Sequence, residues 1–171
     1  MVQFLKTDIC VVGAGSGGLS VAAGAVQMGA DVVLVEGGKM GGDCLNYGCV
    51  PSKALLAAAH AAHVHTRARG LGLSARAPQV NFEQVMDHVH DVIAGIAPVD
   101  SVDRFSKLGV KVIENYGRFI SPKIMAAGKY YIAAKRFVIA TGSSAHVPEI
   151  EGLADAPFLT NETIFDLRDA P

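Results

Sequence analysis

A glycine-rich turn between two apolar runs constrains the fold of this chain more than any other feature. Residues 8–12 are typical of a buried parallel strand, and the motif Gly-Ala-Gly-Ser-Gly-Gly follows directly at residues 13–18. The alanine-rich stretch that runs to about residue 28 predicts a helix, and residues 31–36 predict a second strand. These elements form a βαβ unit with a right-handed crossover. We therefore expect an α/β fold with a parallel sheet.

Three glycines of this turn have separate expected tasks. Gly13 allows a tight turn, Gly15 lets the backbone approach a pyrophosphate, and Gly18 lets the helix pack closely on the strand. Glu36 ends the second strand, where its carboxylate can accept hydrogen bonds from an adenosine ribose and would repel a 2′-phosphate. Glycine-rich turns also occur for packing alone, but the register of Glu36 favours a bound dinucleotide, either FAD or NAD.

Cys44 and Cys49 lie five positions apart in residues 41–53, the segment GGDCLNYGCVPSK. In an ideal helix this spacing separates the Cα atoms by about 8.7 Å, and in a strand by roughly 16 Å. A disulfide needs less than about 7 Å. A bridge between them would therefore require an irregular turn, for which Gly48 supplies the conformational freedom. Such a bridge would be reduced easily, which favours thiol exchange over a structural role.

A helix is expected to follow this segment, with Pro51 in its first turn, good helix formers at residues 54–69 and Gly70 at its end. Cys49 would then lie near the helix N-terminus, where the dipole favours a thiolate. Lys53 lies about one turn further on. The cysteine pair could instead be two small core residues or a metal site, and we weigh both alternatives lower.

The middle of the chain predicts further helices. Asn81 and Gln84 resemble a capping box that opens an amphipathic helix ending at Ile96, and Pro98 should break it before a helical pattern resumes at residues 100–108. Residues 70–80 predict a surface loop. Five short strands are then expected, which would form an antiparallel meander attached to the parallel sheet, at residues 110–113, 116–120, 123–126, 130–133 and 136–140.

The last predicted strand leads into the polar turn Thr-Gly-Ser-Ser at residues 141–144, at the edge where cofactors of open α/β sheets bind. Residues 148–171 are expected to be loop-rich, with one short helix after Asn161. Histidines at 60, 63, 65, 88 and 90 lack an obvious set of partner ligands, so no metal site is predicted.

The charge composition of the chain limits the kinds of partner that it can be expected to bind. With 15 basic and 16 acidic residues the formal charge is −1, which shows no electrostatic footprint for nucleic acid or an anionic membrane. A small-molecule substrate is expected instead. The N-terminus lacks a secretion signal, apolar runs fall short of the roughly 18 residues of a membrane span, and three cysteines fit a reducing compartment. A cytoplasmic location is therefore expected.

Three segments together resemble the flavoprotein pyridine nucleotide-disulfide oxidoreductases, the family of dihydrolipoamide dehydrogenase, glutathione reductase and mercuric reductase. They are residues 13–18 with Glu36, residues 41–53, and residues 138–143 with the sequence VIATGS. The resemblance implies a Rossmann-like FAD-binding domain, with a parallel sheet flanked by helices and an added antiparallel β-meander. It also implies that the first segment binds FAD.

The resemblance implies roles for individual residues. Cys44 would exchange with substrate, Cys49 would lie against the flavin as the charge-transfer thiol, and Lys53 would lie near the flavin ring. In the family reaction two electrons pass from NAD(P)H to FAD, then to the disulfide, then to a disulfide or metal-ion substrate. The residues that it implies for FAD binding are Gly13, Gly15, Gly18, Glu36, Gly42, Asp43, Cys44, Lys53, Gly117, Thr141, Gly142 and Ser143.

Family members are much longer, and this sequence contains no second G-x-G-x-x-G. We therefore expect residues 1–147 to be the N-terminal, incomplete part of an FAD-binding domain and residues 148–171 to be a linker toward a nicotinamide-binding domain. Alone, the chain should be inactive, whereas the full-length parent should be a homodimeric enzyme. Two alternatives stay open: a non-catalytic FAD-binding module, and metal reduction of the mercuric-reductase type.

Overall fold

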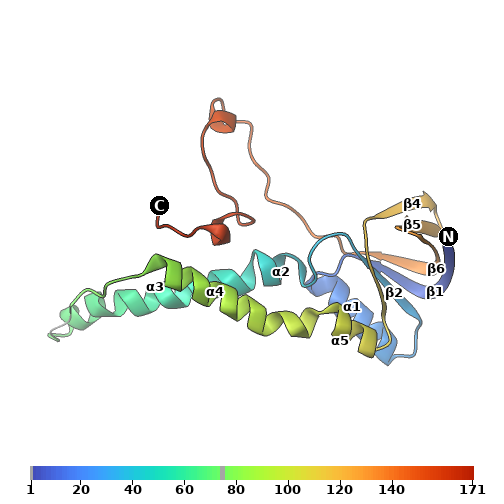
Figure 1. Ribbon diagram of the computed structural model, residues 1–171, viewed down its shortest axis with the longest axis horizontal. Coiled ribbons are helices and arrows are strands. Elements are labelled where there is room, and N and C mark those ends of the chain that lie inside the picture. Colours follow the sequence, from blue (N-terminus) through green and yellow to red (C-terminus); the bar gives the residue numbers. More distant parts are fainter. Residues whose placement is uncertain (1, 74–75) are drawn as a thin grey trace. The chain divides into compact units, whose positions relative to one another are not determined.

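A mixed six-stranded sheet with helices forms the fold in the computed structural model, which describes residues 2–73 and 76–171 (Figure 1). The strands are β1 (Gln3–Val12), β2 (Val32–Glu36), β3 (Lys111–Glu114), β4 (Gly117–Ser121), β5 (Ile124–Ala127) and β6 (Tyr130–Ile139). The helices are α1 (Ser16–Gln27), α2 (Gly42–Asn46), α3 (Cys49–Gly70), α4 (Phe82–Ile96) and α5 (Val102–Lys107), with the 3-10 turns η1 (Ala97–Asp100), η2 (Leu153–Asp155) and η3 (Ile164–Asp166).

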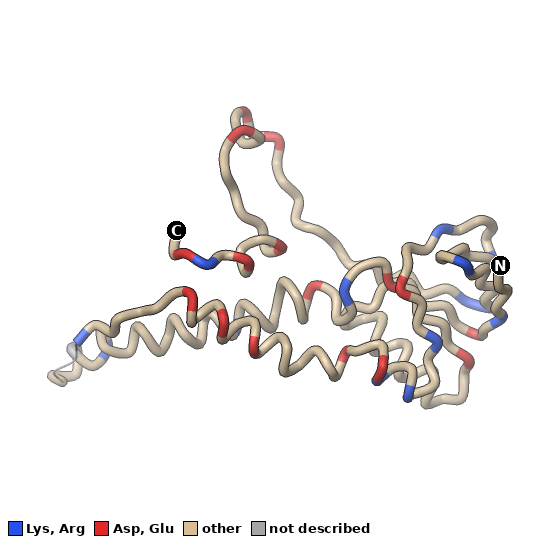
Figure 2. The backbone as a smooth tube through the Cα atoms, in the orientation of Figure 1, with Lys and Arg blue, Asp and Glu red and all other residues tan. Residues whose placement is uncertain are grey.

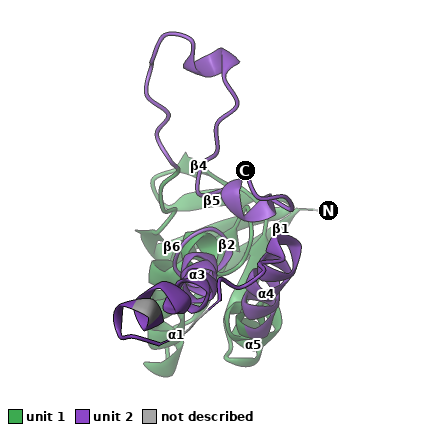
Figure 3. Cartoon of the chain, turned by 90° about the vertical axis from the view of Figure 1, so that its left-hand side faces the viewer, with its two compact units in different colours: residues 1–44, 96–144 green, residues 45–95, 145–171 purple. Residues whose placement is uncertain are grey.

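The chain divides into two compact units (Figure 3). Unit 1 comprises the chain up to Cys44 together with Ile96–Ser144, and it contains the whole sheet with α1 and α5. Unit 2 comprises Leu45–Gly95 and Ala145–Pro171, and it contains α3 and most of α4. Acidic residues predominate along α4 and the C-terminal segment, whereas the strands β4 to β6 carry basic residues (Figure 2).

The sheet has the strand order β3-β2-β1-β6-β5-β4. β2 pairs in parallel with both β1 and β3, and β1 pairs in parallel with β6. β5 runs antiparallel to both β6 and β4. The predicted α/β class, with a parallel sheet and an antiparallel addition, is therefore confirmed.

Two details of the predicted meander are wrong. The strand expected at residues 110–113 is β3, which belongs to the parallel part of the sheet because it pairs with β2. The two strands expected at residues 130–133 and 136–140 are one strand, β6, which pairs with β1 from Gln3 to Val12. Ala134 and Lys135 were expected to separate the two strands, but both lie within β6, where Lys135 is exposed.

Both faces of the sheet carry buried clusters. On one face, α1 and α5 cover residues such as Val11 and Leu34, and Phe105 of α5 is buried with them. On the other face, Met125 of β5 joins Cys10 and Val35. Burial raises the pKa of the Cys10 thiol to about 12, so this cysteine is a core residue, as its apolar run predicted.

Unit 2 is built on α3 and α4. Met86 and Val89 of α4 are fully buried in a cluster with Ala54 of α3 and Phe165 of η3. The predicted cap of α4 is confirmed, because the Gln84 N–H donates to the Asn81 side chain at 3.2 Å. Residues 74 and 75 of the predicted 70–80 loop lie outside the described residues. Within the described parts of the chain, none of the helices combines the length and apolar character needed to cross a bilayer.

Candidate nucleotide and dithiol site

The turn between β1 and α1 requires glycine at two positions. Gly13 has φ +103°, and a Cβ there would lie 2.2 Å from the Ala140 carbonyl oxygen. A Cβ at residue 18 would lie 1.8 Å from the Gly13 carbonyl oxygen. Since real Cβ atoms do not approach backbone atoms this closely, both glycines are needed for α1 to begin directly against the ends of β1 and β6.

Gly15 differs from these two glycines because the protein leaves room around it. It is the N-cap of α1 with φ −79°, which any residue adopts. A Cβ there would meet a single backbone atom of the described residues, the Gly42 Cα at 3.9 Å, and a Cβ at Gly17 would meet nothing within 4 Å. The N-terminus of α1 therefore presents an open backbone surface, which is the arrangement that binds phosphate groups.

Two further glycines, Gly41 and Gly42, hold the segment that contains the cysteines against the turn between β1 and α1. Gly41 and Gly42 both have positive φ, and the Gly41 N–H donates to the Ala14 carbonyl at 2.9 Å. A Cβ at residue 42 would lie 2.6 Å from the Gly15 Cα. Asp43 and the half-buried Cys44 follow in α2, which begins at Gly42. Gly42 is thus held against the glycine turn, and Asp43 and Cys44 follow it directly in the chain. The contact with Gly15 was not predicted.

Glu36 points into the same turn. One carboxylate oxygen accepts the Ala14 N–H at 2.5 Å, and the other accepts the Gly38 N–H at 2.6 Å. The carboxylate is thereby held at the carboxyl end of β2, beside the backbone that precedes α1. A carboxylate is an acceptor with further lone pairs on both oxygens, so Glu36 can still receive hydroxyl donors.

Gly117 opens β4 close to the residues that follow Glu36. A Cβ at residue 117 would lie 2.6 Å from the Met125 sulfur, so the strand requires glycine there. The preceding Tyr116 packs its ring on Gly37, where a Cβ would lie 2.4 Å from the Tyr116 Cδ1. Tyr116 was not among the predicted site residues, since its contact with Gly37 joins segments far apart in the sequence.

The turn after β6 also reaches the phosphate turn. The Ala140 N–H donates to the Val12 carbonyl at 2.8 Å, and the Thr141 Cα would lie 3.1 Å from a Cβ at Gly13. Gly142 has φ +69°, and a Cβ there would meet nothing within 4 Å. Thr141, Gly142 and Ser143 are all exposed. Unit 1 therefore gathers the predicted residues of three turns at the carboxyl ends of β1, β2 and β6.

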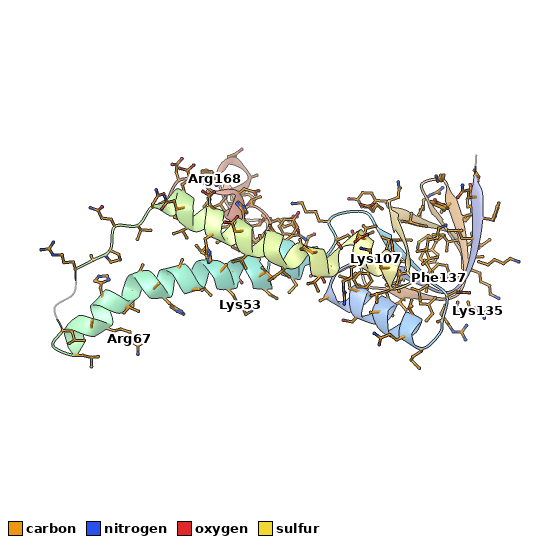
Figure 4. The ribbon with its side chains drawn as sticks, turned by 60° about the horizontal axis from the view of Figure 1, so that its bottom comes forward. Lys53, Arg67, Lys107, Lys135, Phe137 and Arg168 are labelled. Atoms are coloured by element: carbon orange, nitrogen blue, oxygen red, sulfur yellow. The ribbon has the colours of Figure 1, made fainter. Side chains whose placement is uncertain are left out.

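Cys49 and Lys53 belong to unit 2, at the start of α3. Figure 4 labels Lys53 on this helix. The helix begins at Cys49, in agreement with the prediction that Pro51 lies in its first turn and Cys49 near its N-terminus. The Ser52 N–H donates to the Gly48 carbonyl at 3.1 Å. Pro51 is fully buried in its first turn. Cys49 is exposed, so its sulfur is accessible at the positive end of the α3 dipole.

Across residues 2–73 and 76–171, no group of three or more His, Cys, Asp or Glu side chains is arranged to hold a metal ion. The histidines of α3 and α4 therefore provide no donor set of that size.

Comparison with known proteins identifies the family. The family described as pyridine nucleotide-disulphide oxidoreductase matches residues 7–170. The chain belongs to this family. It is 32% identical over 164 residues to a mercuric reductase of Bacillus cereus, covering 96% of the chain and 26% of that protein. It is 34% identical over 160 residues to a dihydrolipoyl dehydrogenase of Pseudomonas aeruginosa, covering 85% of the chain and 33% of that protein.

A solved structure supports the fold. The Cu(II) complex of the HOCl-induced flavoprotein disulfide reductase RclA from Escherichia coli matches with a TM-score of 0.75 at 22% identity, covering 95% of this chain and 34% of that one. The predicted resemblance is therefore confirmed at the level of family and fold. The chain spans 26% and 33% of the lengths of the two curated relatives described above.

Proposed function

We propose that this chain is the FAD-binding part of a NAD(P)H-dependent flavoprotein oxidoreductase that reduces a disulfide or a metal ion through Cys44 and Cys49. The observation that carries the proposal is the contrast among the glycines of the phosphate turn. Gly13 and Gly18 are required by neighbouring protein atoms, whereas Gly15 leaves open the backbone surface that a pyrophosphate would cover.

The residues present fit FAD. The open N-terminus of α1 suits its pyrophosphate, and Glu36 suits the adenosine ribose. Gly117 would face the adenine, because the preceding Tyr116 contacts Gly37, the residue after Glu36. When bound, FAD would supply the hydride and electron chemistry. The residues proposed to hold it are Gly13, Gly15, Gly18, Glu36, Gly42, Asp43, Cys44, Lys53, Gly117, Thr141, Gly142 and Ser143.

Glu36 favours an unphosphorylated ribose. Its carboxylate is acceptor-only, and its two backbone donors leave lone pairs on each oxygen for the ribose hydroxyls. A 2′-phosphate brought to this point would face the glutamate charge directly. Because the surrounding loop is fixed through Ala14 and Gly38, Glu36 cannot turn away without losing both hydrogen bonds.

The two cysteines would perform the exchange with substrate. The Cys44 thiolate attacks a substrate disulfide, forms a mixed disulfide and expels one substrate thiolate. The Cys49 thiolate then attacks the Cys44 sulfur, which closes the Cys44–Cys49 disulfide and releases the second substrate thiolate. Each departing thiolate takes a proton from water. Lys53, one turn into α3, would place a positive charge beside this chemistry.

Metal-ion reduction is a second candidate, favoured by the 32% identity to a mercuric reductase. Thiolates are soft ligands, so the same reduced pair could hold a soft metal ion such as Hg²⁺. Titration of the reduced chain with Hg²⁺, followed by thiolate absorbance, distinguishes the pair from either cysteine alone. Loss of tight binding in both Cys44→Ser and Cys49→Ser would support it, and unchanged binding in either would contradict it.

The organisation of the parent protein is part of the proposal. Residues 1–147 would belong to the FAD-binding domain, and residues 148–171 would lead toward a nicotinamide-binding domain. The parent would be a cytoplasmic homodimer acting on a small molecule, and the 171-residue chain would not oxidise NAD(P)H by itself. Steady NADH or NADPH consumption by the purified chain would contradict this last point.

Calorimetric titration of the chain with FAD and with ADP tests the nucleotide site. Gly15→Ala should weaken both ligands at least about tenfold, because a methyl group would stand where the phosphates approach the α1 N-terminus. The matched control is Gly24→Ala, also on α1 with nothing within 4 Å, which should bind normally. Failure of the wild-type chain to bind ADP, or normal binding by Gly15→Ala, would overturn the proposal.

A further inference from the structure

The packing of α3 is concentrated at the end of the helix that carries Cys49 and Lys53. Of the α3 side chains that the structure describes, Pro51 and Ala54 are the buried ones. Ala54 directly follows Lys53 in the chain, whereas Leu56, two residues further on, is already 55% exposed. The start of α3 is therefore the part of this helix that packing holds in place.

Ala54 belongs to a cluster that takes one residue from the C-terminal part of the chain. The other buried members are Met86 and Val89 of α4 and Phe165 of η3. Phe165 is the single buried residue of the segment 145–171, with an exposed fraction of 8%. A segment that is otherwise largely exposed thus contributes one aromatic ring to the packing at the start of α3.

The turn that presents Phe165 is held on both sides. Before it, the Thr160 N–H donates to Thr163 Oγ1 at 3.0 Å, and the Thr163 N–H donates to the Thr160 carbonyl at 3.1 Å. After it, Arg168 forms an ion pair with Asp87 of α4, and Figure 4 labels this arginine. The ion pair is exposed and contributes little by itself, so the buried ring is the main contact of the turn with α3 and α4.

We propose that Phe165 is a positioning residue for the dithiol chemistry, because its packing holds the start of α3 and thereby places Cys49 and Lys53. The inference rests on the proposed function, which gives Cys49 its exchange partner and treats the C-terminal segment as a connection to another domain. Removal of a buried ring leaves a cavity into which neighbouring side chains shift. Such a shift at Ala54 would displace the turns of α3 that carry the cysteine and the lysine.

The equilibrium of disulfide formation measures this placement. The reduced chain and one glutathione disulfide exchange to give the Cys44–Cys49 disulfide and two glutathione thiols, so two electrons and two protons pass from the protein to glutathione. The equilibrium constant is larger when the protein holds the two sulfur atoms in a favourable position for the bond. A loosely held Cys49 should therefore form the disulfide less favourably.

The test measures this constant in glutathione buffers by alkylating the remaining thiols and weighing the products by mass spectrometry. Phe165→Ala should lower the constant about fivefold, which raises the reduction potential of the pair by about 20 mV. Phe165→Leu keeps a large apolar side chain and should lower the constant about twofold. Circular dichroism verifies folding, and if Phe165→Ala does not fold, a wild-type constant in Phe165→Leu would overturn the proposal.

Phe158→Ala is the matched control, because Phe158 is a phenylalanine of the same segment with an exposed fraction of 46%. It should leave the constant unchanged. A second measurement follows the reaction of Cys44 with dithiobis(nitrobenzoate) in a Cys49→Ser background, where the remaining Cys10 is buried. Because Cys44 belongs to unit 1, adding Phe165→Ala should leave this rate unchanged.

The possible outcomes separate the positioning role from a purely structural one. An unchanged constant in folded Phe165→Ala, even with a lowered melting temperature, would show that the ring only stabilises the fold. An equal loss of Cys44 reactivity would show that the effect does not act through α3, and this too would overturn the proposal. If the wild-type chain formed no Cys44–Cys49 disulfide at all, the dithiol part of the proposed function would be wrong instead.

Discussion

Unit 1 and unit 2 achieve their structures in different ways. Unit 1 has buried clusters on both sheet faces, and its turns are fixed where the backbone of one residue touches the backbone of another, as Gly42 touches Gly15. The described part of unit 2 has one buried cluster, centred on Met86, and helix residues such as Leu56 and Val64 remain more than half exposed. Unit 1 therefore combines side-chain packing with close backbone contacts, whereas the described part of unit 2 depends on a single packed cluster.

This difference separates the two halves of the proposed chemistry. The residues proposed for the phosphates, the ribose and the base all belong to unit 1, together with Cys44. Cys49 and Lys53 belong to unit 2, where their positions depend on the helix α3. Nucleotide recognition should therefore be sensitive to added atoms in unit 1, and the dithiol partner should be sensitive to lost packing in unit 2.

The largest loss of stability is expected from a substitution at Gly18, where two backbone segments are in close contact. Gly18→Ala would place a methyl carbon 1.8 Å from the Gly13 carbonyl oxygen, and neither the turn nor α1 can move without breaking the sheet contact. We expect a loss of more than about 3 kcal/mol in the free energy of unfolding, measured by urea denaturation, because overpacking against a rigid neighbour exceeds the usual cost.

Gly24→Ala is the control for this substitution, because it lies on the same helix with open space around it. Alanine favours a helix over glycine by up to about 1 kcal/mol, so this variant should be as stable as the wild type or slightly more stable. If Gly18→Ala unfolded at the same urea concentration as Gly24→Ala, the close backbone contact at Gly18 would not be a determinant of the stability of unit 1.

A smaller loss is expected from the packing of unit 2. Met86 is fully buried against Ala54, Val89 and Phe165, and Met86→Ala should cost about 2 to 3 kcal/mol, at the low end for such substitutions because a small cluster can partly collapse. Hydrogen exchange should show faster amides in α3 and α4 than in β1 and β2. Leu56→Ala, at a 55% exposed site, should change little. Equal acceleration in the sheet would show that the units unfold as one.

Local signals explain what the sequence could predict. The first strand, the glycine turn and α1 are set by residues close together in the chain, and Asn81 caps α4 through an equally local contact. The family motifs added the residue roles, which no periodicity contains. The roles themselves stay predictions until nucleotide binding and thiol exchange are measured.

Contacts between segments far apart in the chain account for the features that the sequence did not predict. β6 continues through Lys135 and Arg136 because β1 supplies hydrogen-bond partners along its length, a fact invisible in the local polar pattern. The same is true of Tyr116, which is placed by Gly37 on another strand end. In both cases a residue far away in the sequence determines the structure, and the local sequence pattern does not contain that information.

The smallest effect is expected at the ion pair between β1 and β6, which lies at the surface of unit 1. Lys135 donates to Asp8 at 2.5 Å, and the Asp31 N–H donates to the same carboxylate at 3.0 Å; these contacts lower the pKa of Asp8. A carboxylate with a lowered pKa stabilises the fold above its unfolded pKa of about 3.9 and loses that contribution as the pH falls through its folded pKa.

Asp8→Asn should therefore melt slightly below the wild type at pH 6. The gap should begin to narrow as the pH falls below about 4 and should close as the pH falls through the lowered folded pKa of Asp8. The pKa of Lys135 is raised by the same contact, so at the alkaline end the pair weakens as the pH rises through that pKa. Salt should shrink the pH 6 gap because the pair is exposed. A gap that stayed constant from pH 6 to pH 3 would show that Asp8 acts only through its side-chain shape, and that charge contributes nothing to joining β1 and β6.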